Sequence, residues 1–123
     1  MERGKRKSTK TSVREADIQH SILDYLSYMR IFHYRNNSGA MIGEYKGKKS
    51  FDRFGAKGSP DIICVIDGRY IGIEVKSEIG RQSENQQIFQ DRLEKAGGLY
   101  ILARSLDDVI NELNTDKIKK TIK

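Results

Sequence analysis

The sequence predicts one small α/β domain, a mixed central β-sheet flanked by helices, in the order α-β-β-β-α-β-α. The chain has 123 residues, which is enough for a single hydrophobic core. Apolar residues recur at helical spacing in some segments, whereas short apolar runs next to Gly-containing turns predict strands in others. No repeat or linker divides residues 13–114, so we expect one domain between a flexible basic arm (1–12) and a basic tail (115–123).

The first helix is predicted over residues 11–30. Ser12 followed three residues later by Glu15 has the form of a capping box, which predicts a helix start at this point. The helix should bury one stripe of apolar residues at helical spacing. This stripe consists of Ile18, Ile22, Leu26 and Met29.

Three strands are expected next. Residues 31–37 predict the first, and residues 38–60, rich in Gly, Lys and Ser, predict a long loop of the kind that is often functional. Residues 61–67 and 69–77 predict two strands joined by an Asp-Gly turn, which is a strong hairpin signal.

The chain should then return to helices and a fourth strand. A helix is predicted over residues 83–98, ending at its two terminal glycines. A strand over 99–103 and a capped helix over 105–114 complete the order.

The net charge of +6 is concentrated in three regions. Residues 1–14 contain six Lys or Arg and one Glu, and residues 115–123 contain four Lys and one Asp. Residues 30–57 contain seven basic and two acidic residues. Together these regions favour a polyanion as partner, although basic ends alone are equally typical of solvated, disordered tails.

The single cysteine, Cys64, lies in an apolar run and is expected to be a buried hydrophobe rather than a reactive thiol. His20 and His33 form no zinc pattern with it, which argues against a zinc finger. The chain has no transmembrane run and no signal-peptide core, so we expect a cytosolic protein, in a bacterium or in the host cell of a virus.

The predicted hairpin carries two acids on one face. With a two-residue turn, Asp61 lies directly opposite Glu74, with Cβ atoms roughly 4.5–5.5 Å apart, and Lys76 points to the same face. The opposite face is apolar and should belong to the core. It consists of Ile62, Cys64, Ile66, Ile71, Ile73 and Val75.

Two carboxylates at this separation repel each other by about 3 kcal/mol at an effective dielectric constant near 20. A divalent cation between them would offset the repulsion, and carboxylates are typical ligands of Mg²⁺. Alternatively, Lys76 neutralises one acid in a purely structural cluster. Two acids, a metal and a lysine suit phosphodiester hydrolysis, because the metal polarises the phosphate and the lysine stabilises developing charge.

Pro60-Asp61 followed by Glu74-Val75-Lys76 resembles the pattern of PD-(D/E)XK nucleases. The flanking segments GSPD, EVKS, SENQQ and READIQHSILDYL are similar to the VRR-NUC (virus-type replication-repair nuclease) domain over most of residues 13–113. The resemblance implies a restriction-endonuclease-like core, whose α-β-β-β-α-β order the predicted elements match.

The resemblance also implies roles for individual residues. Asp61 and Glu74 match the metal-binding acids, the backbone carbonyl of Val75 completes the metal shell, and Lys76 matches the catalytic lysine. Glu15 matches an acid that the first helix brings to the same site, whereas its spacing alone favours a helix cap.

Three further implications concern the helix after the hairpin, the metal and the substrate. Gln86 matches the glutamine that follows the hairpin, although an exposed glutamine is the usual interpretation. Mg²⁺ is the implied cofactor, with Mn²⁺ as the alternative. The implied activity is a structure-specific DNA endonuclease of DNA repair, acting as a homodimer on branched DNA such as four-way (Holliday) junctions.

Two groups of residues are candidates for DNA contacts. In residues 45–54, basic and aromatic side chains alternate, which suits nucleic acid but also a solvated loop. The basic members are Lys46, Lys48, Lys49 and Arg53. Asn36, Asn37 and Ser38 would either contact the DNA backbone or form a turn.

Two other functions stay open. One is a flap, nick-processing or restriction-type nuclease with the same chemistry. The other is a non-catalytic DNA-binding module in which the acids are structural. The residue types do not exclude cleavage of RNA.

Overall fold

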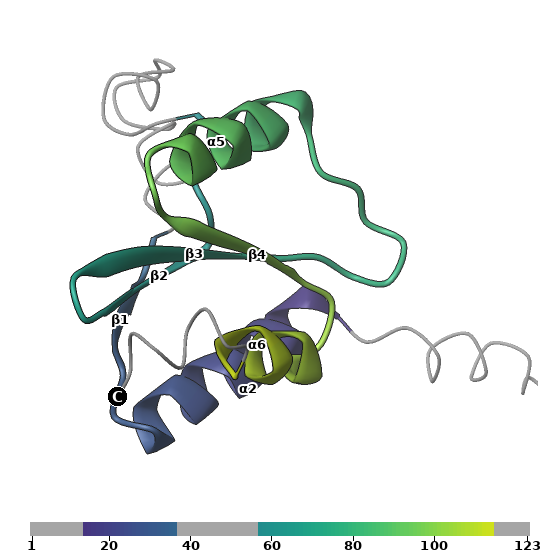
Figure 1. Cartoon of the computed structure of the whole chain (residues 1–123). Coiled ribbons are helices and arrows are strands. Elements are labelled where there is room, and N and C mark those ends of the chain that lie inside the picture. Colours follow the sequence, from purple (N-terminus) through teal and green to yellow (C-terminus); the bar gives the residue numbers. More distant parts are fainter. Residues whose placement is uncertain (1–13, 37–56, 115–123) are drawn as a thin grey trace, which may run out of the picture.

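The computed structural model describes residues 14–36 and 57–114. Its elements confirm the predicted order and are labelled as in Figure 1. They are α2 (Glu15–Tyr28), β1 (Phe32–Arg35), β2 (Ile62–Ile66), β3 (Arg69–Val75), α5 (Glu84–Lys95), β4 (Leu99–Ala103) and α6 (Leu106–Leu113). The predicted arm, the predicted tail and most of the predicted loop lie outside the described residues.

The four strands form one mixed sheet in the order β1-β2-β3-β4. The pairs β1–β2 and β2–β3 are antiparallel, and β4 is parallel to β3 because α5 carries the chain back along the sheet. The register of the hairpin is the predicted one, with Ile66 opposite Arg69 and Ile62 opposite Ile73. Asp67 (φ 49°) and Gly68 (φ 81°) adopt the left-handed conformation that a two-residue hairpin turn requires.

Helices cover both faces of the sheet. Figure 1 shows α2 and α6 on one face and α5 on the other. The predicted apolar face of the hairpin is buried throughout and packs in the core with Ile22, Leu26, Val109 and Leu113. Cys64 lies within it, fully buried, and burial raises the pKa of its thiol to about 12. The prediction of a buried cysteine is therefore confirmed.

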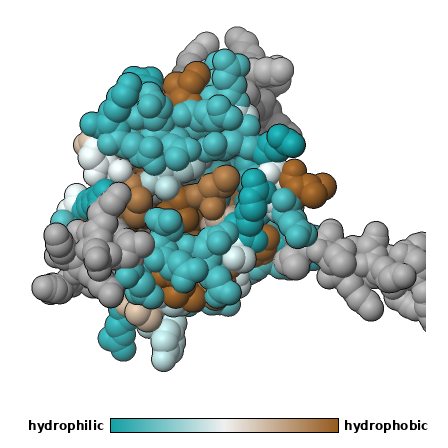
Figure 2. Space-filling model, turned by 45° about the vertical axis from the view of Figure 1, so that its right-hand side comes forward, coloured by the Kyte–Doolittle hydropathy of each residue, from teal (hydrophilic) through white to brown (hydrophobic). Residues whose placement is uncertain are grey.

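The second face of the sheet is less tightly covered. None of the residues of α5 is fully buried. In Figure 2 the surface over α5 is mainly hydrophilic, and apolar side chains gather in a band below it. No helix in the described ranges is long and apolar enough to cross a membrane.

The start of α2 differs from the prediction. Arg14 is the N-cap residue and makes no side-chain capping bond, so Glu15 does not hold the third helical position that the predicted capping box requires, and Ser12 lies outside the described residues. Glu15 is instead the first helical residue, and its carboxylate bonds to a distant part of the chain. The buried stripe ends at Leu26, because Met29 lies beyond the last helical residue and is 47% exposed.

The other helices begin and end as expected. The Ser83 side chain accepts a hydrogen bond from the Gln86 backbone N–H, and the Gln86 side chain accepts one from Ser83 N–H, which makes a capping box for α5. Gly97, with φ 100°, follows the end of α5. Ser105 caps α6 through the N–H of Asp108.

Candidate active site

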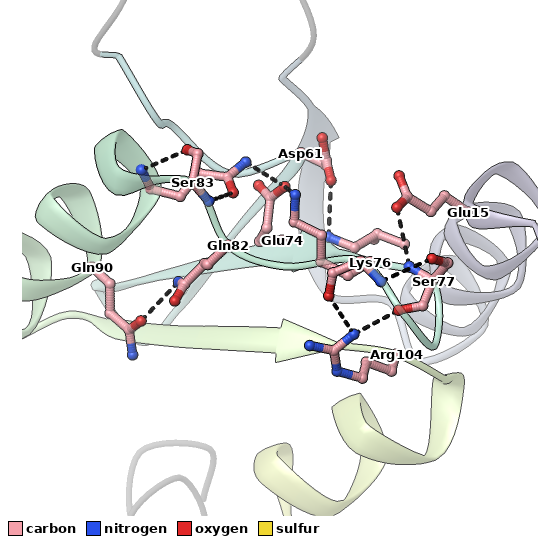
Figure 3. Close-up of polar contacts among 12 residues, drawn as sticks. Glu15, Asp61, Glu74, Lys76, Ser77, Gln82, Ser83, Gln90 and Arg104 are labelled. Carbon is pink, nitrogen blue, oxygen red and sulfur yellow. Dashed lines mark hydrogen bonds and ion pairs between the residues drawn. The ribbon is translucent and has the colours of Figure 1, made fainter.

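The predicted hairpin acids lie at the end of β3, where the beginnings of α2 and α5 approach the sheet (Figure 3). Asp61 immediately precedes β2, so it lies just outside the strand ladder. Its Oδ2 accepts a hydrogen bond of 2.8 Å from the N–H of Val75. This bond directs the Asp61 carboxylate across to β3, next to Glu74.

Glu74 is only 4% exposed, which is unusual for a charged residue. Its Oε2 accepts a hydrogen bond from Gln86 Nε2 at 2.8 Å and lies 3.7 Å from Lys76 Nζ. Its Oε1 is buried and has no hydrogen-bond partner among the described residues. Within residues 14–36 and 57–114, one oxygen of the carboxylate therefore has partners and the other has none.

The surroundings of both acids disfavour ionisation of their carboxyl groups. Burial, followed by the charge of Asp61, raises the pKa of Glu74 to about 7, although Lys76 and the Gln86 hydrogen bond oppose the shift. Burial also raises the pKa of Asp61, against the hydrogen bond from Val75. The charge of Glu15 acts in the same direction on both acids. Such a cluster would be stabilised by an added positive charge.

A divalent metal ion fits these residues. The buried Glu74 Oε1 and the Asp61 carboxylate provide the hard oxygen ligands that Mg²⁺ and Mn²⁺ prefer. Within the described ranges, no group of three His, Cys, Asp or Glu side chains is arranged to hold a metal ion. Water and backbone oxygen atoms are further ligands that such an ion accepts. Mg²⁺ commonly keeps several waters in protein sites.

Lys76 directly follows β3, and its side chain is largely buried. Its backbone N–H donates to the Ala103 carbonyl at 3.0 Å, which ties this residue to the end of β4. The ammonium group therefore lies beside Glu74 on a fixed backbone. The geometry agrees with the predicted placement of Lys76 on the face of the two acids.

Glu15 reaches the same region from α2. Its Oε2 accepts a hydrogen bond of 3.0 Å from the backbone N–H of Ser77, which is 62 residues away in the sequence. The fold thus brings the acid of the first helix next to Lys76, and Figure 3 shows it on the α2 side of the cluster.

Gln86 connects α5 to the hairpin acids. Its Oε1 accepts from the N–H of Ser83, and its Nε2 donates to Glu74. The interpretation of Gln86 as an ordinary exposed glutamine is wrong, because both ends of its amide are engaged.

Asn36 has a positioning contact that the sequence did not indicate. Its Nδ2 donates to Ser59 Oγ at 2.6 Å and to the Pro60 carbonyl at 3.0 Å, and its backbone N–H donates to the Asp61 carbonyl. Asn36 therefore holds the segment that carries Asp61. The other residues proposed for DNA contacts lie outside the described ranges. They are Asn37, Ser38, Lys46, Lys48, Lys49 and Arg53.

Arg104 also contacts the site region, and sequence reasoning did not single it out. Its Nη1 donates to backbone carbonyls of the turn that follows Lys76. The only local signal is its position between a buried strand and a helix cap, which many surface arginines share.

Comparison with known proteins supports the fold. A solved structure described as a VRR_NUC domain protein superposes with a TM-score of 0.61, at 20% sequence identity, over 83% of this chain and 86% of that chain. No protein-family model matches the sequence, and neither does a curated protein. The chain therefore has the fold of a VRR_NUC domain protein, and in this fold Asp61, Glu74 and Lys76 gather at the end of β3.

Proposed function

We propose that the chain is a metal-dependent deoxyribonuclease that hydrolyses phosphodiester bonds. The observation that carries the proposal is the buried Glu74 carboxylate, whose Oε1 has no hydrogen-bond partner in the described part of the chain, although Asp61 and Lys76 lie beside the carboxylate. A carboxylate oxygen left unpaired in the protein interior is costly unless a ligand completes it. The similarity of the fold to a VRR_NUC domain protein supports the same activity.

Asp61, Glu74 and the Val75 carbonyl would hold the metal, which we propose to be Mg²⁺, with Mn²⁺ as a substitute. When bound, the metal would polarise the scissile phosphate and lower the pKa of a bound water. Lys76 would orient the attacking water and stabilise the charge that develops on the phosphate. Gln86 would hold Glu74 by Oε2, so that Oε1 stays available.

A purely structural role for the acids explains less. Lys76 lies 3.7 Å from Glu74 Oε2, so it compensates at most part of the charge of two neighbouring carboxylates. In a binding module without catalysis, an apolar residue at position 74 would avoid the cost of burying the second acid. The geometry therefore favours an enzyme over a non-catalytic DNA-binding module.

We propose branched DNA, such as a four-way junction, as the substrate, with a homodimer as the active form. One chain offers one candidate site, and symmetric cutting of a two-fold substrate needs two. The basic residues between 30 and 57 would contact the DNA backbone. Flap, nick-processing and restriction-type cleavage are alternatives with the same chemistry.

The test is cleavage of four labelled DNAs: a four-way junction, a flap, a plain duplex and a single strand. Each is incubated with Mg²⁺ or with chelator, using wild type, Asp61→Asn and the control Asp67→Asn, which changes an exposed aspartate in the turn of the same hairpin. We expect Mg²⁺-dependent paired nicks in the junction, lost in Asp61→Asn and kept in Asp67→Asn.

The outcomes separate substrate from chemistry. Cleavage of the flap or duplex instead of the junction would support the proposed nuclease activity and contradict the proposed substrate. DNA binding without cleavage of any substrate, with or without Mg²⁺ or Mn²⁺, would contradict the proposed activity and favour a binding module.

A further inference from the structure

We propose that Arg104 is a positioning residue that holds the turn formed by residues 77–80 and thereby fixes Lys76 and Glu15 in the candidate site. This inference rests on the proposed nuclease function. Arg104 follows β4, whereas the turn follows β3, so the contact joins the ends of two neighbouring parallel strands. Figure 3 shows Arg104 below the turn, on the side away from Asp61.

The guanidinium group acts on backbone carbonyls. Arg104 Nη1 donates to the Ser77 carbonyl at 2.6 Å and to the Gly80 carbonyl at 2.8 Å, with a longer contact of 3.3 Å to the Glu78 carbonyl. Among the described residues, no carboxylate forms an ion pair with it. The main contact of this side chain is therefore the turn itself.

The backbone of Arg104 is held by hydrogen bonds at the start of α6. Its own backbone N–H donates to Asp108 Oδ2 at 2.8 Å, and Asp108 N–H donates to the Ser105 side chain in the first turn of α6. Helix α6 is fixed in the core through Val109 and Leu113. The backbone of Arg104 is thus attached to a helix that packs in the hydrophobic core.

The same turn touches two site residues. The Ser77 N–H donates to Glu15, and the Gly80 N–H donates to the Ser77 hydroxyl at 3.1 Å. A Cβ at Gly80 would lie 3.3 Å from Glu15 Oε2 and 3.4 Å from Lys76 Cδ. The backbone of Ser77 is therefore held on both sides, by the Glu15 carboxylate at its N–H and by Arg104 at its carbonyl.

Displacement of this turn should also displace Lys76 and Glu15 in the candidate site. Lys76 precedes Ser77 directly, so a shift of the Ser77 backbone changes the direction of the Lys76 backbone. Glu15 would lose the donor that orients its carboxylate. An ångström of misplacement at a reacting centre costs about a hundredfold in rate.

The test compares wild type with Arg104→Met, Arg104→Lys and the control Arg69→Met. Arg69 is a suitable control because its Nε also donates to a backbone carbonyl, that of Gly97, at the opposite end of β3. Three quantities are measured: amide exchange of Ser77 and Gly80 by NMR without metal, the single-turnover cleavage rate constant, and DNA affinity in chelator. Circular dichroism shows that each variant is folded.

We expect Arg104→Met to speed exchange at Ser77 and Gly80 at least about tenfold, as loss of charge-assisted hydrogen bonds predicts. The cleavage rate constant should fall about tenfold to a hundredfold with DNA affinity unchanged. Arg104→Lys should recover part of both losses, because an ammonium group supplies donors without the planar fork. Arg69→Met should change neither the amide exchange of Ser77 and Gly80 nor the cleavage rate constant.

Two results would overturn the inference while the nuclease function stands. In one, exchange in the turn accelerates but the cleavage rate does not change, so the turn does not position the catalytic groups. In the other, exchange is unchanged and only DNA affinity falls, which would make Arg104 a phosphate contact. If wild type cleaves no nucleic acid, the proposed function fails and the positioning role fails with it.

Discussion

At the scale of single residues, the two oxygens of Glu74 have different environments. Oε2 faces the Gln86 amide and the Lys76 ammonium group, whereas Oε1 is buried and no described residue bonds to it. Burial and the neighbouring Asp61 raise the Glu74 pKa to about 7, so near neutral pH a proton and a metal ion would compete for this carboxylate. The protonation state of Glu74 should therefore affect both the stability of the folded protein and its affinity for a metal ion.

Glu74→Gln should stabilise the metal-free protein at pH 8 but not at pH 5. The folded-state pKa of Glu74 lies above its unfolded value, so the protonated form is favoured by folding, and wild type loses stability as the pH rises from about 4.5 to 7. Glutamine stays neutral and avoids this loss, which is on the order of 3 kcal/mol for a shift of this size. Urea unfolding in chelator at both pH values measures the difference.

A control separates this effect from the removal of any negative charge. Glu78→Gln removes an exposed carboxylate four residues away and should keep the wild-type pH dependence. If Glu74→Gln lowers the free energy of unfolding equally at both pH values, ionisation of Glu74 does not destabilise the wild-type protein.

At the scale of secondary-structure elements, the start of α5 serves two purposes. Gln86 completes the capping box with Ser83 and also donates to Glu74, so the same side chain stabilises the helix end and orients a site carboxylate. Helix α5 has no fully buried residue. Its attachment to the sheet therefore depends on such polar contacts more than that of α2, which buries Ile18, Ile22 and Leu26.

Gln86→Leu should destabilise the protein by about 1–3 kcal/mol, because it removes the cap contact and leaves a buried charged oxygen without its donor. Gln87→Leu is the matched control: Gln87 is adjacent and exposed, and leucine and glutamine have similar helix propensities. We expect that variant to lie within about 0.5 kcal/mol of wild type. Thermal unfolding at pH 8 measures both, and equal effects would contradict a special role of Gln86.

At the scale of the whole molecule, charge is segregated along the chain. The described cluster of acids contrasts with the basic residues between 30 and 57, where seven Lys or Arg accompany two acids. This distribution suits a DNA-binding enzyme, in which basic residues attract the backbone and the acids hold metal.

DNA affinity should therefore fall steeply with salt, and the lysines proposed as DNA contacts should account for part of the slope. Replacing Lys46, Lys48 and Lys49 by alanine should reduce the slope of log K against log salt by about one for each phosphate that these lysines neutralise. Fluorescence anisotropy with a labelled junction in chelator measures the slope. A triple variant with the slope of wild type would exclude these lysines from the DNA interface.

The hairpin, its register and the apolar face that it buries follow from the amino-acid sequence alone. These features depend on turn chemistry and on the two-residue period of a strand, which are local properties. The placement of Lys76 on the face of Asp61 and Glu74 followed from the same period, and Ser83 and the glycines after α5 marked the ends of that helix.

The distant groups that meet the hairpin depend on how the helices and strands pack against one another. Glu15 was predicted from its spacing to cap its own helix, but packing of α2 against the sheet directs it to Ser77. The contacts of Asn36 with Pro60 and of Arg104 with Ser77 likewise join separate strands. Such contacts depend on the relative placement of packed elements, which no local sequence period specifies, because it arises from the burial of the whole core.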